Sequence, residues 1–388
     1  SITPVSDYES LGWYNGNTKV GDTNGTYALN EDITFTSKAK KLEPYMMARD
    51  TTKAFWQSDY VDKISTIDVL DNKNVPSDAV ISWDVSDKQN KSVMAWFIND
   101  PDNAGMYKLY IGGNGRVVAN ENSKLLFAGA LDSGGTFYKT TLMNLANLDT
   151  SKVTNMNFMF LGCSNLTNLD LSNFDTSNVA SMYAMFSMWN SNSNYHLNRG
   201  SLKILNLTGF NTSKVTTMRE MFVFNNNLTE IKGLDGFDTS NVTDMRSMFS
   251  KCQSLEVLDL SNFNTSKVTN MDSMFNMWVT NSEDSFGNLV SLNLNNFDTR
   301  NVTDMRYMFI GLNKLTKLNL CNFDTSKVTN MNYMFQNTTN LKKIYVGPNW
   351  TTSNATTTNM FISSGVSSVT QSNNCEYDAE DISVSLQT

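Results

Sequence analysis

The sequence predicts an α/β fold: a right-handed leucine-rich-repeat solenoid with one short strand and one short helical turn in each repeat. The first observation is a block, F-[DN]-T-[SR]-x-V-[TA]-x-M-x-x-M-F, that recurs seven times. The second is its basic period of 26 residues, with two longer repeats. The third is an L-x-x-L-x-L pattern between blocks, as at Leu255, Leu258 and Leu260. The blocks begin at Leu148, Phe174, Phe210, Phe237, Phe263, Phe297 and Phe323.

The two halves of the repeat predict different elements. The L-x-L alternation is typical of a short strand whose leucines point inward. The V-x-x-M-x-x-M-F segment spaces apolar residues by three, as in one or two turns of helix. The Asp-Thr-Ser or Asn-Thr-Ser before it is typical of turns and helix N-caps. Because each unit buries its apolar edge only against its neighbours, the repeats must stack and be capped.

The chain before the blocks predicts a β-rich N-terminal cap. Alternating apolar residues over Tyr107–Asn120 flank Gly112–Gly115, which favours a hairpin. With the apolar runs at 80–83 and 93–97, this hairpin would form the cap. We therefore divide the chain into a segment of unassigned fold (1–79), the cap (80–147), the solenoid (148–350) and a C-terminal cap or linker (351–388).

Composition excludes several classes of function. The 388 residues carry a net charge of −8, whereas nucleic-acid binders need a basic face. The single histidine excludes sites that need two imidazoles, and the four cysteines lack C-x-x-C spacing. No run approaches the ~18 apolar residues of a membrane span. We expect a monomer that is not an enzyme, with no cofactor, no metal, no nucleic-acid partner and no membrane insertion. Whether Cys321 and Cys375 pair is left open.

The repeat also resembles a known family. F-D-T-S-N-V, V-T-N-M-N-Y-M-F and F-L-G-C-S-N-L-T-N-L-D-L are similar to the BspA-type leucine-rich repeats of bacterial surface proteins, in the variety found in lactobacilli, other Gram-positives and mycoplasmas. The segment W-D-V-S at Trp83–Ser86 resembles the stretch before such arrays. The resemblance covers about 80–350. It implies a secreted or cell-wall-attached adhesin, with host mucin, epithelial or matrix glycoproteins and polysaccharides as partners.

The two longer repeats supply the first candidate site. In each, a tryptophan replaces the residue three places after the closing phenylalanine of the block and opens an insertion. Two loops leaving the same edge three repeats apart, roughly 14 Å, would form the walls of a groove. The alternative is that each tryptophan only plugs a widened turn. The candidate ligand-binding residues are Trp189, Tyr195, His196 and Arg199 in one loop, and Trp278, Glu283, Asp284 and Phe286 in the other.

Two columns of polar residues supply further candidates. The outward strand position holds Asp170, Asn206, Asp235, Asp259, Asn293, Asn319 and Tyr345. Of these, Asp170, Asn206, Asp259 and Asn293 are candidates for hydrogen bonding to sugar hydroxyls, or simply to water and to each other. The residue before the block's valine alternates between lysine and asparagine from Lys152 to Lys327. We interpret the alternation as relief of like-charge repulsion, with a glycan-binding lysine ladder as the alternative.

These observations predict a non-enzymatic extracellular adhesin that binds glycans or glycoproteins through the solenoid and its inserted loops. Binding should strengthen at acidic pH, because the net negative charge falls toward zero near the pI of 4.8. The alternative is a structural spacer of a surface protein, with the binding activity elsewhere. Fourteen of the 22 methionines occupy the two repeat positions, where the spacing predicts core packing rather than a binding surface.

Overall fold

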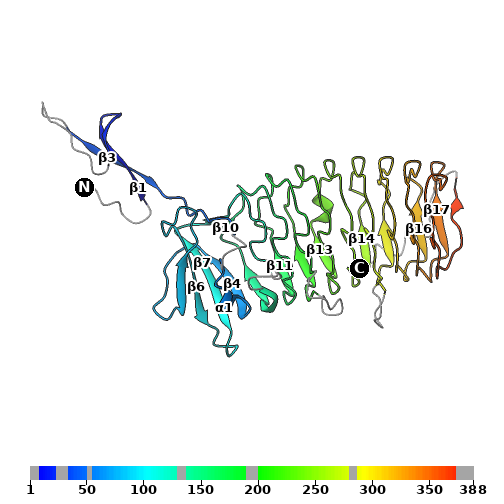
Figure 1. Ribbon diagram of the computed structural model, residues 1–388, viewed down its shortest axis with the longest axis horizontal. Helices are drawn as coiled ribbons and strands as arrows, with labels where there is room; N and C mark the ends of the chain where they lie inside the picture. The colour runs from blue at the N-terminus through cyan, green and yellow to red at the C-terminus, as the bar shows by residue number, and fades with distance from the viewer. Residues whose placement is uncertain are drawn as a thin grey trace.

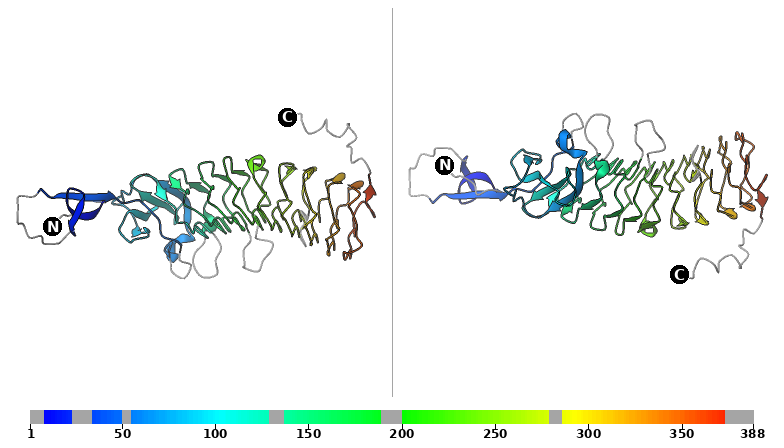
Figure 2. Two further views of the ribbon diagram at one scale, coloured as in Figure 1. Left: turned by 90° about the horizontal axis from the view of Figure 1, so that it is seen from above. Right: turned by 90° about the horizontal axis from the view of Figure 1, so that it is seen from below.

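The computed structural model describes residues 8–22, 34–49, 55–128, 137–188, 200–278 and 286–372. In these residues the protein is an elongated stack of coils that follows two small sheets (Figure 1). The views from above and below show the coils following one another along the long axis (Figure 2). Helix in the described part is limited to α1 (Ser58–Val61) and the 3-10 turns η1 (Phe137–Lys139) and η2 (Leu234–Gly236).

The N-terminal part forms two separate sheets. In the first, β1 (Tyr8–Asn15) pairs antiparallel with β2 (Thr18–Gly21) and β3 (Thr36–Lys41). The second has the order β5-β6-β7-β4-β9 and packs against Trp56, whose Nε1 donates to the carbonyl of Leu126 at 2.8 Å. Its strands are β4 (Ile64–Leu70), β5 (Ile81–Asp84), β6 (Val93–Asn99), β7 (Tyr107–Gly113) and β9 (Leu142–Asn144).

The predicted hairpin over Tyr107–Asn120 is wrong. The strand β7 pairs with β6 and β4, whereas β8 (Val117–Val118) pairs in parallel with β10 (Leu148–Asp149). Gly115 does turn the chain, with a φ of +99°. The turn leads from β7 in the five-stranded sheet to β8 in the coils, so the two strands do not pair with each other. The first coil of the array therefore begins at Val117.

The coils stack through parallel strands that lie in register. Leu169, Leu205 and Ile231 face one another directly on three successive coils. The three sheets in this region have the orders β11-β12-β13, β14-β15 and β16-β17-β18. Their strands are β11 (Asn168–Asp170), β12 (Ile204–Asn206), β13 (Glu230–Lys232), β14 (Val257–Asp259), β15 (Ser291–Asn293), β16 (Lys317–Leu320), β17 (Lys343–Val346) and β18 (Thr370–Gln371).

A second ladder joins the coils at the blocks. One parallel bridge per coil connects Asn122, Asn155 and Ser181 and continues to Thr356. Beside it, block amides donate to the next coil, as Phe186 N–H does to the carbonyl of Met221 at 2.9 Å. Each coil is thus held to its neighbour along two lines of backbone hydrogen bonds.

The predicted α/β class, with a helical turn in each leucine-rich repeat, is wrong: the described coils are built from strands and turns. The tenth residue after the start of the block has a positive φ in all seven repeats, between +50° and +59°, and this interrupts a right-handed helix. Several block amides, such as those of Phe158 and Phe160, bond the next coil instead of a carbonyl four residues back in their own coil. A turn that buries an apolar side chain at every third residue produces the same spacing in the sequence as a helix does. The residues are Phe158, Ala184, Glu220, Ser247, Ser273, Tyr307 and Tyr333.

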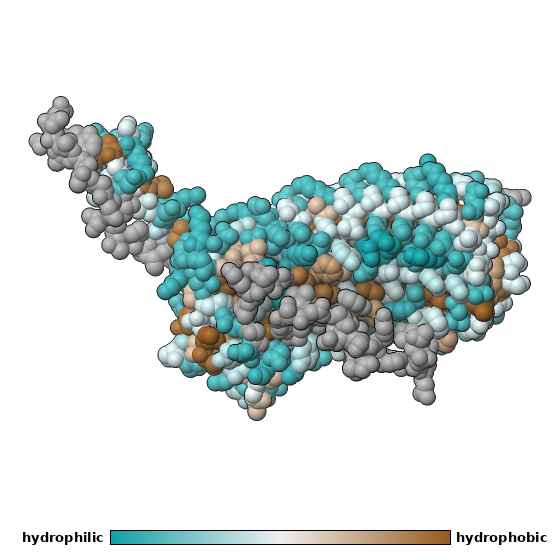
Figure 3. All heavy atoms as spheres, in the orientation of Figure 1, coloured by the Kyte–Doolittle hydropathy of each residue, from teal (hydrophilic) through white to brown (hydrophobic). Residues whose placement is uncertain are grey.

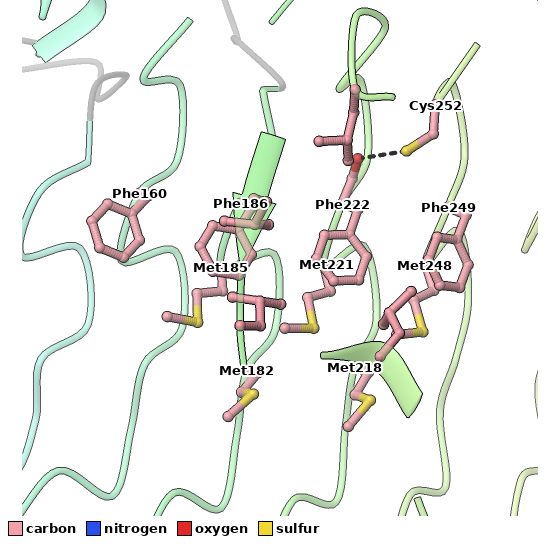
Figure 4. Packing of buried hydrophobic residues seen from close by; sticks show 14 of the residues in the cluster. Phe160, Met182, Met185, Phe186, Met218, Met221, Phe222, Met248, Phe249 and Cys252 are labelled. Atoms are coloured by element: carbon pink, nitrogen blue, oxygen red, sulfur yellow. Dashed lines mark hydrogen bonds between the residues drawn. The ribbon is translucent and has the colours of Figure 1, made fainter. Parts of the chain in front are cut away.

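The interior consists of columns of identical side chains (Figure 4). The rings of Phe160, Phe186 and Phe222 stack with centroids 5.6 and 5.8 Å apart. All fourteen block methionines have no exposed surface, which confirms that they fill the core. Close packing of this kind lets every coil reuse one set of contacts.

The buried turn position three residues after the block supplies a hydrogen-bond donor to the preceding coil in the first, third and fourth repeats. The thiols of Cys163 and Cys252 donate to the carbonyls of Phe127 and Phe222, at 3.0 and 3.1 Å, and Asn225 Nδ2 donates to the carbonyl of Phe186 at 2.7 Å. Cysteine and asparagine are interchangeable here because both can satisfy the carbonyl of the preceding coil. Cys321 is disulfide-bonded, and Cys375 lies outside the described residues.

Candidate binding surface of the coil array

Most residues of the predicted loop site lie outside the described ranges. These are Trp189, Tyr195, His196, Arg199, Glu283 and Asp284. Trp278 and Phe286 are described, and both are half-buried.

The two insertions leave the array from matching roots. Met188 and Met277 precede them, and their amides donate to Val223 and Ile310 on the next coil, each at 2.9 Å. Gly200 and Gly287 follow them, and a Cβ on either glycine would lie within 2.7 Å of the methionine side chain at the other side of the root. The glycines therefore let the chain re-enter against the methionine, in the same way three coils apart.

Trp278 is anchored by its backbone. Its N–H donates to Asn276 Oδ1 at 3.1 Å, and its carbonyl accepts a hydrogen bond from Lys251 Nζ. Gly311, with φ +80°, approaches so closely that a Cβ there would lie 2.9 Å from Trp278 Cβ. Burial lowers the pKa of Lys251 to about 7, since desolvation disfavours the charged ammonium.

The polar side chains of the predicted strand column accept hydrogen bonds from the turns that follow their strands. Asp170 Oδ1 accepts the N–H of Ser172 at 2.9 Å and the Asn206 side-chain amide at 3.0 Å, and these bonds lower the pKa of Asp170. The Oδ1 atoms of Asn206, Asp259 and Asn293 each accept the N–H two residues on, at 3.1, 2.9 and 3.2 Å. One oxygen of each side chain is thus committed to the turn after its strand.

Asp235 does not belong to this column. It lies in η2, and Lys232 pairs with Asn206 in its place. The segment E-I-K-G-L-D-G-F bends at Gly233, whose φ of +88° starts the 3-10 turn. The leucine spacing alone did not reveal this shift.

The lysine–asparagine column is a chain of hydrogen bonds. Lys214, Lys267 and Lys327 each donate from Nζ to the Oδ1 of the asparagine on the preceding coil, at 2.7, 2.6 and 2.8 Å. Those asparagines are Asn178, Asn241 and Asn301, and their Nδ2 atoms donate to serine carbonyls one coil further back. Alternation therefore gives each of these amines an acceptor as well as separating the charges.

Sequence reasoning missed a third surface, which we call the variable ridge. It consists of the ninth and tenth residues after the start of each block, and all but the buried Ala184 are half-buried. The ridge contains Asn157, Phe158, Tyr183, Ala184, Arg219, Glu220, Arg246, Ser247, Asp272, Ser273, Arg306, Tyr307, Asn332 and Tyr333.

Contacts along the ridge hold its aromatic and charged side chains in place. The Tyr183 ring meets Phe158 edge-on at 4.6 Å and lies 5.3 Å from the Arg219 guanidinium carbon. Tyr307 and Tyr333 stack at 5.1 Å. These contacts fix the side chains before any ligand arrives.

Ion pairs continue the ridge between its aromatic ends. Arg246 Nη2 lies 2.8 Å from Asp244 Oδ2, and Arg306 Nη2 lies 2.9 Å from Asp272 Oδ2. Hydrogen bonds to the aspartates raise the pKa of both arginines, and desolvation raises the pKa of Asp304 beside them. The centre of the ridge thus presents paired, half-buried charges.

The signal for this ridge was present in the sequence as variation between repeats. The block's valine, both methionines and the closing phenylalanine are the same in all seven copies, whereas the ninth and tenth positions range over Asn, Tyr, Arg, Asp, Phe, Glu, Ala and Ser. A position that varies within a constant frame is free of the packing that fixes its neighbours.

A separate hollow lies where the N-terminal sheets meet the first coils. Glu43, Tyr45, Arg116 and Lys152 are among the residues that line it, and Lys152 Nζ lies 2.5 Å from Glu43 Oε2. Both signs of charge are present, so the hollow favours no single class of ligand. The face of the protein in Figure 3 is mainly hydrophilic, with small apolar patches over the N-terminal sheets, along the array and near its C-terminal end.

The described residues contain no group of three or more metal-ligating side chains suited to an ion. Their helices include none long and apolar enough to cross a bilayer.

A family model described as Mycoplasma protein of unknown function, DUF285, matches residues 132–199, 191–287 and 277–375, together more than half of the chain. The chain matches no curated protein and no solved structure.

Proposed function

The chain belongs to the family described as Mycoplasma protein of unknown function, DUF285, and from that premise we propose that it is a non-enzymatic surface protein that binds its ligands through the coil array. The observation that carries the proposal is the variable ridge. Its residues change from coil to coil, while the buried residues on either side repeat without change.

A constant frame with a varied surface is how repeat proteins make binding sites. The frame sets positions, and side chains on its surface supply recognition. Tyrosine and arginine, which dominate binding hot spots, occupy six of the fourteen ridge positions. Because neighbouring rings and carboxylates already hold these side chains, little rotamer entropy remains to be lost on binding.

The inserted loops extend this proposal. Their matching roots, Met188 and Met277, lie four and five residues after the ridge positions of the same coils, so each loop begins close to the ridge along the chain. We propose host mucin, matrix glycoproteins and polysaccharides as ligands, and a secreted or cell-wall-attached location. The support for both is the likeness of the repeats to BspA-type surface proteins.

The ridge is tested by removing side chains from its ends and its centre. In the full chain, Tyr183→Ala, Arg246→Ala and Tyr307→Ala together should weaken binding to immobilised mucin or matrix glycoproteins at least thirtyfold, since hot-spot truncations cost ~2 kcal/mol or more each. Surface plasmon resonance measures the change. The matched control is Lys214→Met with Lys267→Met, two exposed changes in the lysine–asparagine column of the two coils between those that carry the ridge changes.

Two results would contradict the proposal. If the triple ridge variant keeps full affinity and an unchanged melting profile, the ridge is not the site. If the unaltered chain binds no glycoprotein or polysaccharide, the spacer alternative replaces it.

A further inference from the structure

Lys251 is a half-buried lysine that no carboxylate among the described residues neutralises. It occupies a turn position with φ +65°, where equivalent positions hold Gly162 and Gly311. From there its side chain crosses to the next coil, and Nζ lies 2.7 Å from Asn276 Oδ1. A desolvated amine without a counter-ion favours its neutral form, which is the nucleophilic form.

The rest of the array provides a built-in comparison. Lys214, Lys267 and Lys327 meet asparagine oxygens at 2.6 to 2.8 Å, as Lys251 does. Those three lysines are exposed, so water solvates their ammonium groups. Lys251 alone among these four pairs combines the short contact with a buried amine.

We propose that Lys251 and Asn276 join in an intramolecular amide cross-link. The lone pair of Nζ attacks Cγ of Asn276, the new Nζ–Cγ bond forms, and the Cγ–Nδ2 bond breaks. One proton of the amine passes to the departing nitrogen, which leaves as ammonia. No oxidant, metal or co-reactant enters the balance.

The surroundings of Asn276 support this reaction. Its Oδ1 accepts the backbone N–H of Trp278 at 3.1 Å, so a fixed donor faces the oxygen on which charge develops during attack. The carbonyl of Trp278 also accepts a hydrogen bond from Nζ, which keeps the amine beside the amide. Holding the two groups together replaces a bimolecular encounter by an intramolecular step.

The product would be a covalent staple at the root of the second insertion. It would join two neighbouring coils where the chain leaves the array at Trp278. Such a staple limits how far these coils separate when the array is pulled or partly unfolded, because it shortens the loop released between 251 and 276.

Intact-mass spectrometry of the purified full chain tests the proposal. The expected mass is lower than that of the sequence by one ammonia molecule, not by two or more. Tryptic digestion should yield one branched peptide that joins Lys251 to Asn276. In protein purified rapidly at pH ~5.5, the loss should proceed faster after transfer to pH ~8.5, because the pKa of about 7 makes the amine neutral there.

Three variants identify the bond. Lys251→Met and Asn276→Ala should each restore the full mass, whereas Lys267→Met, in the exposed pair, should leave the ammonia loss unchanged. The Lys251 variant also separates the cross-link from succinimide formation at Asn–Gly bonds, which releases ammonia too. A folded, unaltered chain that keeps its full mass at pH ~8.5 would overturn the proposal, as would an ammonia loss that persists in Lys251→Met.

Discussion

The threonine at the third position of each block links its coil to the next through one hydroxyl group. In the fourth repeat, Thr239 Oγ1 donates to the carbonyl of Asn264 at 3.0 Å and accepts the N–H of Asn264 at 2.8 Å. Only 1% of Thr239 is exposed, so water cannot replace these bonds. The same hydroxyl-to-carbonyl bond recurs along the column from Thr150 to Thr325.

We predict that Thr239→Val destabilises the array. Valine keeps the shape but removes the buried hydroxyl that bonds both the N–H and the C=O of Asn264, which costs ~1–3 kcal/mol. The exposed Thr243, four residues later, makes one 3.2 Å bond to Thr216, so Thr243→Val should change stability by less than ~0.5 kcal/mol. Urea unfolding followed by circular dichroism measures both. Equal effects would contradict the role given to the buried hydroxyl.

The sequence predicted which residues lie in the interior better than it predicted the backbone conformation. The repeated methionines and phenylalanines are buried as their spacing indicated. The left-handed residues could not be found in the same way, because Phe158, Tyr307 and Tyr333 are residue types that seldom adopt positive φ. Neighbouring coils impose that conformation through hydrogen bonds that a local pattern does not contain.

At the scale of elements, the leucine alternation correctly located short strands such as β14, whose Leu258 is buried. Apolar spacing of three did not distinguish a helix from a turn, since both return side chains to one side. The sequence patterns also did not predict the five-stranded sheet. Its strand β4 pairs with β7 and β9, from distant parts of the chain, and such pairing depends on tertiary context.

The inserted loops are the elements on which the predicted site depends. We expect trimming of 190–200 and 279–287, combined with Trp189→Cys and Trp278→Cys, to weaken ligand binding while the melting profile stays unchanged. The fold should survive because Cys252 already closes a turn of ordinary length in the fourth repeat. The substitutions prevent an indole from overfilling the shortened turn. Binding measured by surface plasmon resonance should fall at least thirtyfold, the loss expected for removed hot-spot anchors.

Single-loop trims serve as the control, because they show whether one wall of the groove suffices. Undiminished affinity of the doubly trimmed protein would assign binding to the ridge alone or to the N-terminal sheets. Six of the eight predicted loop residues lie outside the described part, so this experiment tests a prediction that stays open.

For the whole molecule, charge predicts stronger adhesion in acid. The net charge moves from −8 at pH 7 to zero near pH 4.8, so repulsion from sialylated or sulfated surfaces fades over that range. Binding to an anionic polysaccharide, measured from pH 7 to ~4.5, should strengthen. Affinity that stayed flat or fell would contradict the prediction.

The fold should persist over the same range. Hydrogen bonds to turn amides and hydroxyls lower the pKa of Asp175, Asp238 and Asp324 in the folded state. A lowered pKa contributes stability above the unfolded value, near ~3.9, and this stability is lost as pH falls through the folded value. Circular dichroism at pH ~4.5 should therefore still report the folded array.

The pairing of lysine with asparagine on successive coils restricts how such an array can lengthen. Duplicating one coil would preserve the contacts of methionine, phenylalanine and threonine, since each coil meets only its neighbours. It would also place two lysines or two asparagines side by side, so that an amine such as that of Lys214 would face another amine instead of Asn178. Duplicating two coils restores every pair. Adding an even number of coils therefore keeps every lysine beside an asparagine, whereas adding an odd number does not.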